Sequence, residues 1–72
     1  MDDKYKDVGD PYTHVEEECA ELIKAICKTR RFGLYNWNPK DPDKTTNKEL
    51  ILREMTDVKI RISELEIELQ KV

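Results

Sequence analysis

Closely spaced glutamates are the chemically most distinctive feature of the sequence. The segment THVEEECAELIKAI, residues 13–26, contains Glu16, Glu17, Glu18 and Glu21. Like charges at this spacing on an exposed helix cost a few tenths of a kcal/mol per pair. That cost is small, so the run is either an ordinary solvated face or a site for a counter-ion. Carboxylate oxygens are ligands for hard divalent cations, and Mg²⁺ is the usual one when a substrate phosphate completes the shell.

A second acidic pair lies further along the chain, where Glu54 and Asp57 are three residues apart. On a helix this spacing places both side chains on one flank. Glu17, Glu18 and Glu21 similarly share one flank of their helix, with Glu18 nearest the apolar stripe. If the two helices pack as an antiparallel pair, we expect the acidic flanks to converge and bind a cation.

Helix signals flank both acidic segments, and the fold class is predicted to be all-α. Thr13 and Glu16 have capping-box spacing, and Asp10-Pro11 offers an alternative start one turn earlier. Thr46 and Glu49 repeat the capping-box spacing. We expect a helix over about 13–31, a loop over about 32–46 rich in Pro, Asn and Asp, and a helix over about 47–71. Residues 1–11 are expected to be a flexible arm, and 12–72 a single domain.

Apolar residues form one stripe on each predicted helix. The first stripe is expected to pack against the second within the hairpin. A hairpin has only one internal face to bury, so the further apolar residues Leu52, Ile60 and Ile67 predict an interface with another copy. A homodimer would form a four-helix bundle, and a homotetramer remains open. The two stripes comprise Val15, Cys19, Leu22, Ile23 and Ile26, and then Ile51, Met55, Val58, Ile62, Leu65 and Leu69.

Size and composition favour such an assembly. A chain of 72 residues buries only about 60% of its unfolded surface, so a lone monomer would be marginal. Cys19 and Cys27 are eight residues apart on one predicted helix. That separation, about 12 Å of helical rise, exceeds the ~7 Å limit for a disulfide, so we expect two reduced, buried thiols.

The net charge of −3 gives no basic field for nucleic acid, and no apolar run is long enough for a membrane span. We expect a cytoplasmic protein.

The two acidic segments together resemble a known enzyme family. EECAE, followed by EMTD, is similar to the EExxE…ExxD signature of the all-α nucleoside triphosphate pyrophosphohydrolases. The closest likeness is to the small MazG-like members often found in bacteriophages. EECAELIKAICK, NWNP and the pattern N-x-E-L-I-L-x-E-M-x-D-V extend the resemblance over about residues 15–65. Family members commonly have more helices per subunit, so either two hairpins assemble into one four-helix unit or this is a minimal member.

The resemblance implies a specific reaction. These enzymes hydrolyse a nucleoside triphosphate between the α and β phosphates, giving a nucleoside monophosphate and pyrophosphate, with Mg²⁺ as cofactor and Mn²⁺ as a possible substitute. By position, the metal ligands would be Glu17, Glu18, Glu21, Glu54 and Asp57. Glu18 and Glu21 would be the catalytic residues. For a phage protein, the location would be the host cytoplasm.

Several further residues are candidates for substrate binding. Lys24, Lys28 and Arg31 are candidate phosphate contacts, although the two lysines also have the spacing of ordinary helix ion pairs. Trp37 is a candidate for stacking on a base, with Asn38 reading its edge, or else it plugs the mouth of the hairpin. The alternative function is a non-catalytic nucleotide-binding or protein-binding module, or a purely structural hairpin.

Overall fold

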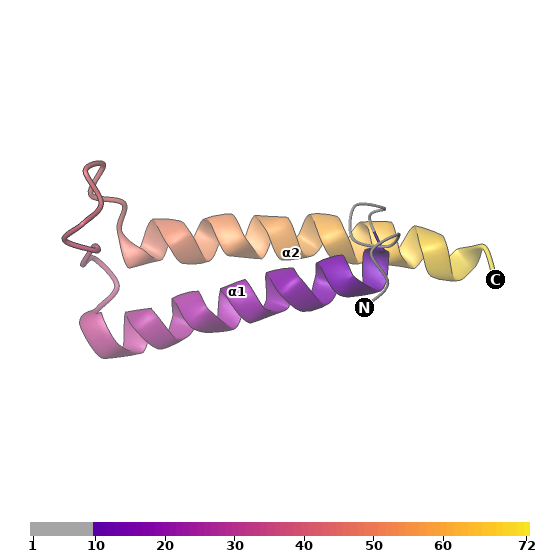
Figure 1. Ribbon diagram of the computed structural model, residues 1–72, viewed down its shortest axis with the longest axis horizontal. Coiled ribbons are helices and arrows are strands. Elements are labelled where there is room, and N and C mark those ends of the chain that lie inside the picture. Colours follow the sequence, from indigo (N-terminus) through magenta and orange to yellow (C-terminus); the bar gives the residue numbers. More distant parts are fainter. Residues whose placement is uncertain (1–9) are drawn as a thin grey trace.

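The computed structural model describes residues 10–72, which form two helices packed side by side (Figure 1). Helix α1 spans Pro11–Phe32 and α2 spans Asn47–Gln70. The helices run in opposite directions and are joined by a loop over 33–46 (Figure 1). The predicted all-α hairpin is confirmed. The predicted flexible arm lies outside the described residues as far as residue 9.

Helix α1 begins at Asp10-Pro11, the earlier of the two starts that the sequence allows. The Asp10 carboxylate accepts hydrogen bonds from the Tyr12 N–H at 3.0 Å and from the Thr13 hydroxyl at 2.9 Å. These bonds, with that from Thr13 the stronger influence, lower the pKa of Asp10. Pro11 suits the first helical position because it has no N–H to satisfy there. Thr13 therefore lies within the first turn and supports the cap as a donor.

The other helix ends also follow the local sequence. Gly33 ends α1 with a φ of 97°, a left-handed conformation that favours glycine, and its N–H donates to the Thr29 carbonyl at 2.8 Å. Thr46 caps α2: its hydroxyl accepts from the Glu49 N–H at 3.2 Å, and its own N–H donates to the Glu49 carboxylate at 3.3 Å. The predicted capping box of the second helix is confirmed.

The loop is ordered by its own polar groups. The Asp41 carboxylate accepts from the Asp43 N–H at 3.0 Å and from the Thr45 N–H at 2.9 Å. Trp37 and Thr46 form an isolated antiparallel bridge, which brings the two ends of the loop together. The loop is therefore a defined connector between the helices.

Asn47, the first residue of α2, ties the loop to the end of α1. Its side-chain amide donates to the Gly33 carbonyl at 2.7 Å, and its backbone N–H donates to the Asn36 carbonyl at 2.9 Å. At 6% exposure, Asn47 is the buried polar residue of the described chain. A buried amide needs such partners, because an unpaired one costs about 1–3 kcal/mol.

Packing between α1 and α2 differs from the predicted pairing of apolar stripes. Ala25 and Val58 are the buried apolar residues among those described, and none of the larger side chains is fully buried. Glu18 and Leu22 extend the contact side of α1 at helical spacing from Ala25, and both are half-buried. Carboxylates therefore occupy part of the surface between the helices that the sequence assigned to apolar residues.

The outer halves of both predicted stripes are exposed, which corrects that prediction. On α1, Ile23 is 62% exposed and Ile26 38%. On α2, Ile51, Val58 and Leu65 turn towards α1, whereas other members of the same stripe face outwards. The physical reason is the width of the apolar stripe. The stripe spans two heptad positions, and one partner helix covers only part of it. The exposed members on α2 are Met55, Ile62 and Leu69.

The cysteines are both free thiols. Cys19 is half-buried and Cys27 is exposed, so the prediction of two buried thiols is wrong for Cys27. In the part of the chain that the structure describes, neither helix is long and apolar enough to cross a membrane.

Candidate metal centre

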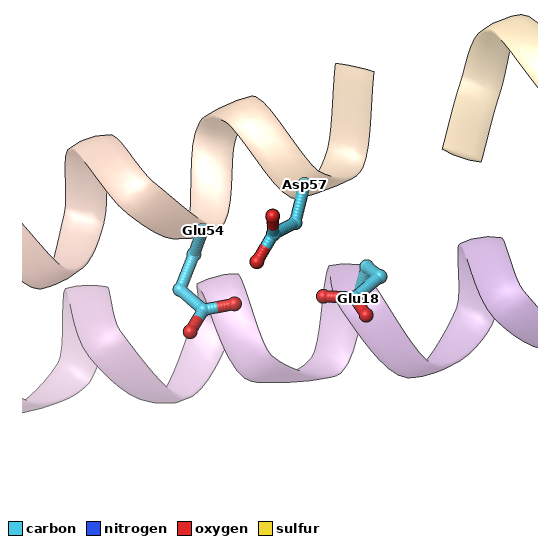
Figure 2. A group of neighbouring side chains, drawn as sticks. All are labelled: Glu18, Glu54 and Asp57. Atoms are coloured by element: carbon cyan, nitrogen blue, oxygen red, sulfur yellow. The ribbon is translucent and has the colours of Figure 1, made fainter. Parts of the chain in front are cut away.

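Three carboxylates from the two helices meet halfway along the hairpin. Glu18 of α1 and Glu54 and Asp57 of α2 each offer one oxygen, and these oxygens lie within 4.8 Å of one another. Figure 2 shows the Glu54 and Asp57 side chains directed from α2 towards α1, beside the Glu18 carboxylate. All three residues are half-buried. We call them the carboxylate triad.

Helical geometry explains why these residues meet. Glu54 and Asp57 are three residues apart, so their side chains project from one side of α2. Glu54 also precedes the buried Val58 by four residues, and Glu18 precedes the half-buried Leu22 by four. Each glutamate therefore shares the contact side of its helix with an apolar residue that packs between the helices.

The electrostatics of the triad disfavour three full negative charges. Partial burial raises the pKa of the Glu54 carboxyl, and the nearby carboxylates of Asp57, Glu18 and Glu21 raise it further. Arg53 acts in the opposite direction with a smaller effect. Both main influences have the same physical origin, because desolvation and like charge each disfavour the ionised form. A bound cation would offset the repulsion among these carboxylates and favour their ionised forms.

The donor set fits a hard divalent cation. All three ligands are carboxylate oxygens, the type that Mg²⁺, Mn²⁺ and Ca²⁺ prefer. Two oxygens on opposite sides of Mg²⁺ lie at most about 4.2 Å apart, and about 5.2 Å apart around Ca²⁺. The oxygens of the triad, at 4.8 Å or less from one another, lie within the span of a Ca²⁺ site and would have to move closer together around Mg²⁺. Water and substrate oxygens would complete the coordination.

The two remaining predicted ligands lie outside the triad. Glu21 is exposed and lines a cleft of about 130 Å³ together with Glu54, so it is adjacent to the triad. Glu17 is also exposed, one residue and therefore about 100° around the helix from Glu18. The structure thus brings together three of the five predicted ligands, with Glu21 next to them and Glu17 further out.

Three clefts lie along the hairpin, and two of them contain residues of the triad. The first, of about 240 Å³, lies under the loop and shares Lys28 and Leu50 with the cleft that contains Glu54. A further cleft of about 270 Å³ contains the other two members of the triad, Glu18 and Asp57. A ligand bound along these clefts would contact both the loop and the triad.

Most predicted substrate-binding residues line these clefts. Lys24 and Lys28 border the cleft beside Glu54, and Trp37 and Asn38 line the cleft under the loop. Arg31 instead lies with its guanidinium 5.9 Å from the centre of the Phe32 ring. The candidate base-binding and phosphate-binding residues are thus brought together, with Arg31 as the exception.

Arg61 is a potential functional residue that the sequence analysis missed. It lines the cleft that contains Glu18 and Asp57, and its guanidinium donates to the Glu64 carboxylate at 3.0 Å. The available signal was its position four residues after Asp57, which places both residues on the same flank of α2. An arginine here can contact a phosphate beside the triad.

Comparison with protein-family models, curated proteins and solved structures finds no match to this chain. The resemblance to MazG-like enzymes therefore depends on the motif residues and on their placement in the hairpin.

Proposed function

We propose that the protein hydrolyses a nucleoside triphosphate between the α and β phosphates in a Mg²⁺-dependent reaction, giving a nucleoside monophosphate and pyrophosphate. The observation that carries the proposal is the triad: Glu18, Glu54 and Asp57 meet across the hairpin within 4.8 Å. These residues belong to the two segments that resemble the EExxE and ExxD motifs. Two carboxylates of α2 and one of α1 converge here, and burial and like charge raise the pKa of Glu54 among them.

The proposed roles follow from position. The triad holds Mg²⁺, which when bound would neutralise phosphate charge and lower the pKa of the attacking water. Glu21, adjacent to Glu54 but exposed, is positioned to orient that water and accept its proton. Glu18 is both a ligand of the triad and a catalytic carboxylate. Glu17 is a further metal ligand at the exposed edge of the site.

The substrate would lie along the cleft under the loop and the cleft of Glu54, which share Lys28 and Leu50. Trp37 stacks on the base beneath the loop, and Asn38 contacts its edge. Lys28 lies between this cleft and the triad, where it and Lys24 contact phosphates. This arrangement places the base at the loop and the scissile phosphates at the carboxylates.

The proposal includes assembly of two hairpins into a four-helix bundle. Support comes from the small apolar core of the described residues, which contains only Ala25 and Val58. The residues predicted to form the interface, Leu52, Ile60 and Ile67, are each more than half exposed in the single chain.

The test is incubation of the pure protein with each common ribo- and deoxyribonucleoside triphosphate and Mg²⁺, with detection of pyrophosphate and monophosphate. We expect at least one nucleotide to be hydrolysed, and Glu18→Gln to abolish product formation. Glu16→Gln is the matched control, because Glu16 is an exposed glutamate of the same helix that lies outside the triad. Binding of a nucleotide without turnover would instead support the non-catalytic module. Equal activity in both variants would contradict the assigned site.

A further inference from the structure

The exposed apolar residues of α2 follow a heptad repeat. Met55, Ile62 and Leu69 are spaced by seven residues and are 39%, 40% and 49% exposed. The residues that alternate with them in the repeat, including Val58 and Leu65, turn towards α1. This is the pattern of a helix that packs on two partners: α1 on one side and a second helix on the adjacent side.

Apolar residues of α1 extend the same surface. At 100° per residue, Ile23 and Ile26 lie on the same side of the contact between helices as Met55 and Ile62, because the two helices are antiparallel. The cleft residues Glu21 and Lys24 fall on the opposite side of α1. The hairpin therefore has one apolar face and one cleft-bearing face. The apolar face comprises Ile23, Ile26, Leu52, Met55, Ile62 and Leu69.

The exposed area is suited to a protein partner of similar size. At about 200 Å² for a fully exposed residue of this size, the six residues present roughly 550 Å² of surface. A standard interface buries about 800 Å² per partner, with an apolar core and a polar rim. The apolar face can therefore supply the core of one stable interface. The single chain has little other apolar burial to stabilise it, since Ala25 and Val58 are its buried apolar residues within the described range.

Charges beside the heptad residues indicate which helix packs on the apolar face and in which direction it runs. Lys59 and Glu66 are both exposed and lie on the outer edge of the apolar face, next to Ile62. If two copies of α2 paired in parallel, the edge that carries Lys59 and Glu66 would lie beside the opposite edge of the partner helix, so these two residues would not meet. If they pair antiparallel about a two-fold axis at Ile62, Lys59 of each copy faces Glu66 of the other. Edge charges of this kind set orientation in helical pairs.

We infer that a second copy of this chain docks on the apolar face, with the two α2 helices antiparallel and Ile62 at the two-fold axis. This contact keeps the dimeric assembly proposed above but places it on another surface, and it does not depend on whether the site hydrolyses nucleotides. It differs from the surface formed by Leu52, Ile60 and Ile67, of which only Leu52 belongs to the apolar face. Ile60 instead lines the cleft of Glu18 and Asp57.

The test is the mass of the protein in solution by sedimentation equilibrium. We expect wild type to be a dimer of the 8.6 kDa chain. Ile62→Lys should shift it to monomer. Ser63→Lys, which adds the same charge at the neighbouring exposed position about 100° around the helix, should leave it dimeric. Ile60→Lys should also remain dimeric.

A charge-reversal series tests the direction without altering an apolar residue. Lys59→Glu should raise the dimer dissociation constant by about tenfold, because it replaces two attractions with two repulsions. Lys59→Glu combined with Glu66→Lys should restore the wild-type value. A monomeric wild type, failure of the double variant to recover, or dissociation by Ile60→Lys but not by Ile62→Lys would overturn the inference. Nucleotide hydrolysis by a monomeric protein would overturn it while leaving the proposed hydrolysis intact.

Discussion

The closed end of the hairpin and its middle differ in how well their polar groups are satisfied. At the closed end, Asn47 bonds to Gly33, and Asp41 bonds to the backbone within its own loop. Halfway along the helices, Glu54 lies among other carboxylates without a hydrogen bond to any of them, and its pKa is raised. The comparison shows that the polar groups of the closed end are satisfied within the chain, whereas the Glu54 carboxyl is not.

Removing the Asn47 amide should have the largest effect on stability, because it removes a hydrogen bond from the region whose polar groups are satisfied. In Asn47→Ala the 2.7 Å bond to the Gly33 carbonyl is lost at a buried position. We expect the free energy of unfolding to fall by about 1–3 kcal/mol, measured by urea denaturation.

The matched control for that variant is Asn36→Ala. Asn36 also donates its amide to a backbone carbonyl, that of Phe32 at 3.1 Å, but it is exposed. The loss of stability in Asn36→Ala should be smaller, because water can hydrogen-bond to the exposed carbonyl in place of the Asn36 amide. Equal losses for the two variants would contradict the importance of burial at Asn47.

Glu54→Gln should have an intermediate effect, with a sign that depends on metal. The raised pKa of Glu54 means that the folded protein binds its proton more tightly than the unfolded chain does. Wild-type stability should therefore fall as the pH rises from the ordinary value of 4.5 through the raised one. In EDTA at neutral pH, Glu54→Gln should melt at a higher temperature than wild type. The difference should vanish at low pH, where the wild-type carboxyl is protonated.

Saturating Mg²⁺ should reverse that order. A cation that binds only the folded state stabilises it, and Glu54→Gln lacks one ligand, so wild type should gain more. Glu16→Gln, which changes an exposed glutamate outside the triad, should respond to Mg²⁺ as wild type does. If Mg²⁺ raised the melting temperatures of wild type and Glu54→Gln equally, the triad would not be the metal centre.

The convergence of the carboxylates was predictable, but the packing that produces it was not. The three-residue spacing of Glu54 and Asp57, and the place of Glu18 at the edge of its stripe, defined one side of each helix. Periodicity does not define how far α1 rotates around α2. In the structure α1 presents Ala25 at the contact, which turns Ile23 and Ile26 outwards. A stripe wide enough for two partner helices was therefore interpreted as one complete contact.

The loop shows a second limit of sequence reasoning. Its Pro, Asn and Asp residues predicted a connector but not which side chain would organise it. Asp41 and Asp43 are both acidic loop residues, yet only Asp41 accepts backbone hydrogen bonds from within the loop. Arg61 was missed for a related reason, since its cleft exists only when Glu18 of the other helix lies opposite. Contacts between segments distant in sequence determine both outcomes.

The smallest effect should come from Asp41, and its pH dependence should oppose that of Glu54. The backbone N–H groups of Thr45 and Asp43 lower the pKa of Asp41, so its stabilising contribution is present above the ordinary value of 3.8 and is lost as the pH falls through the lowered one. Asp41→Asn should therefore slightly lower the melting temperature at neutral pH, and this difference should shrink in acid. Asp43→Asn, at a carboxylate without such hydrogen bonds, is the control and should match wild type throughout. Acid would then weaken the closed end of the hairpin while it relieves the repulsion in the middle. If the melting-temperature differences of Asp41→Asn and Glu54→Gln from wild type changed in the same direction with pH, this contrast would be refuted.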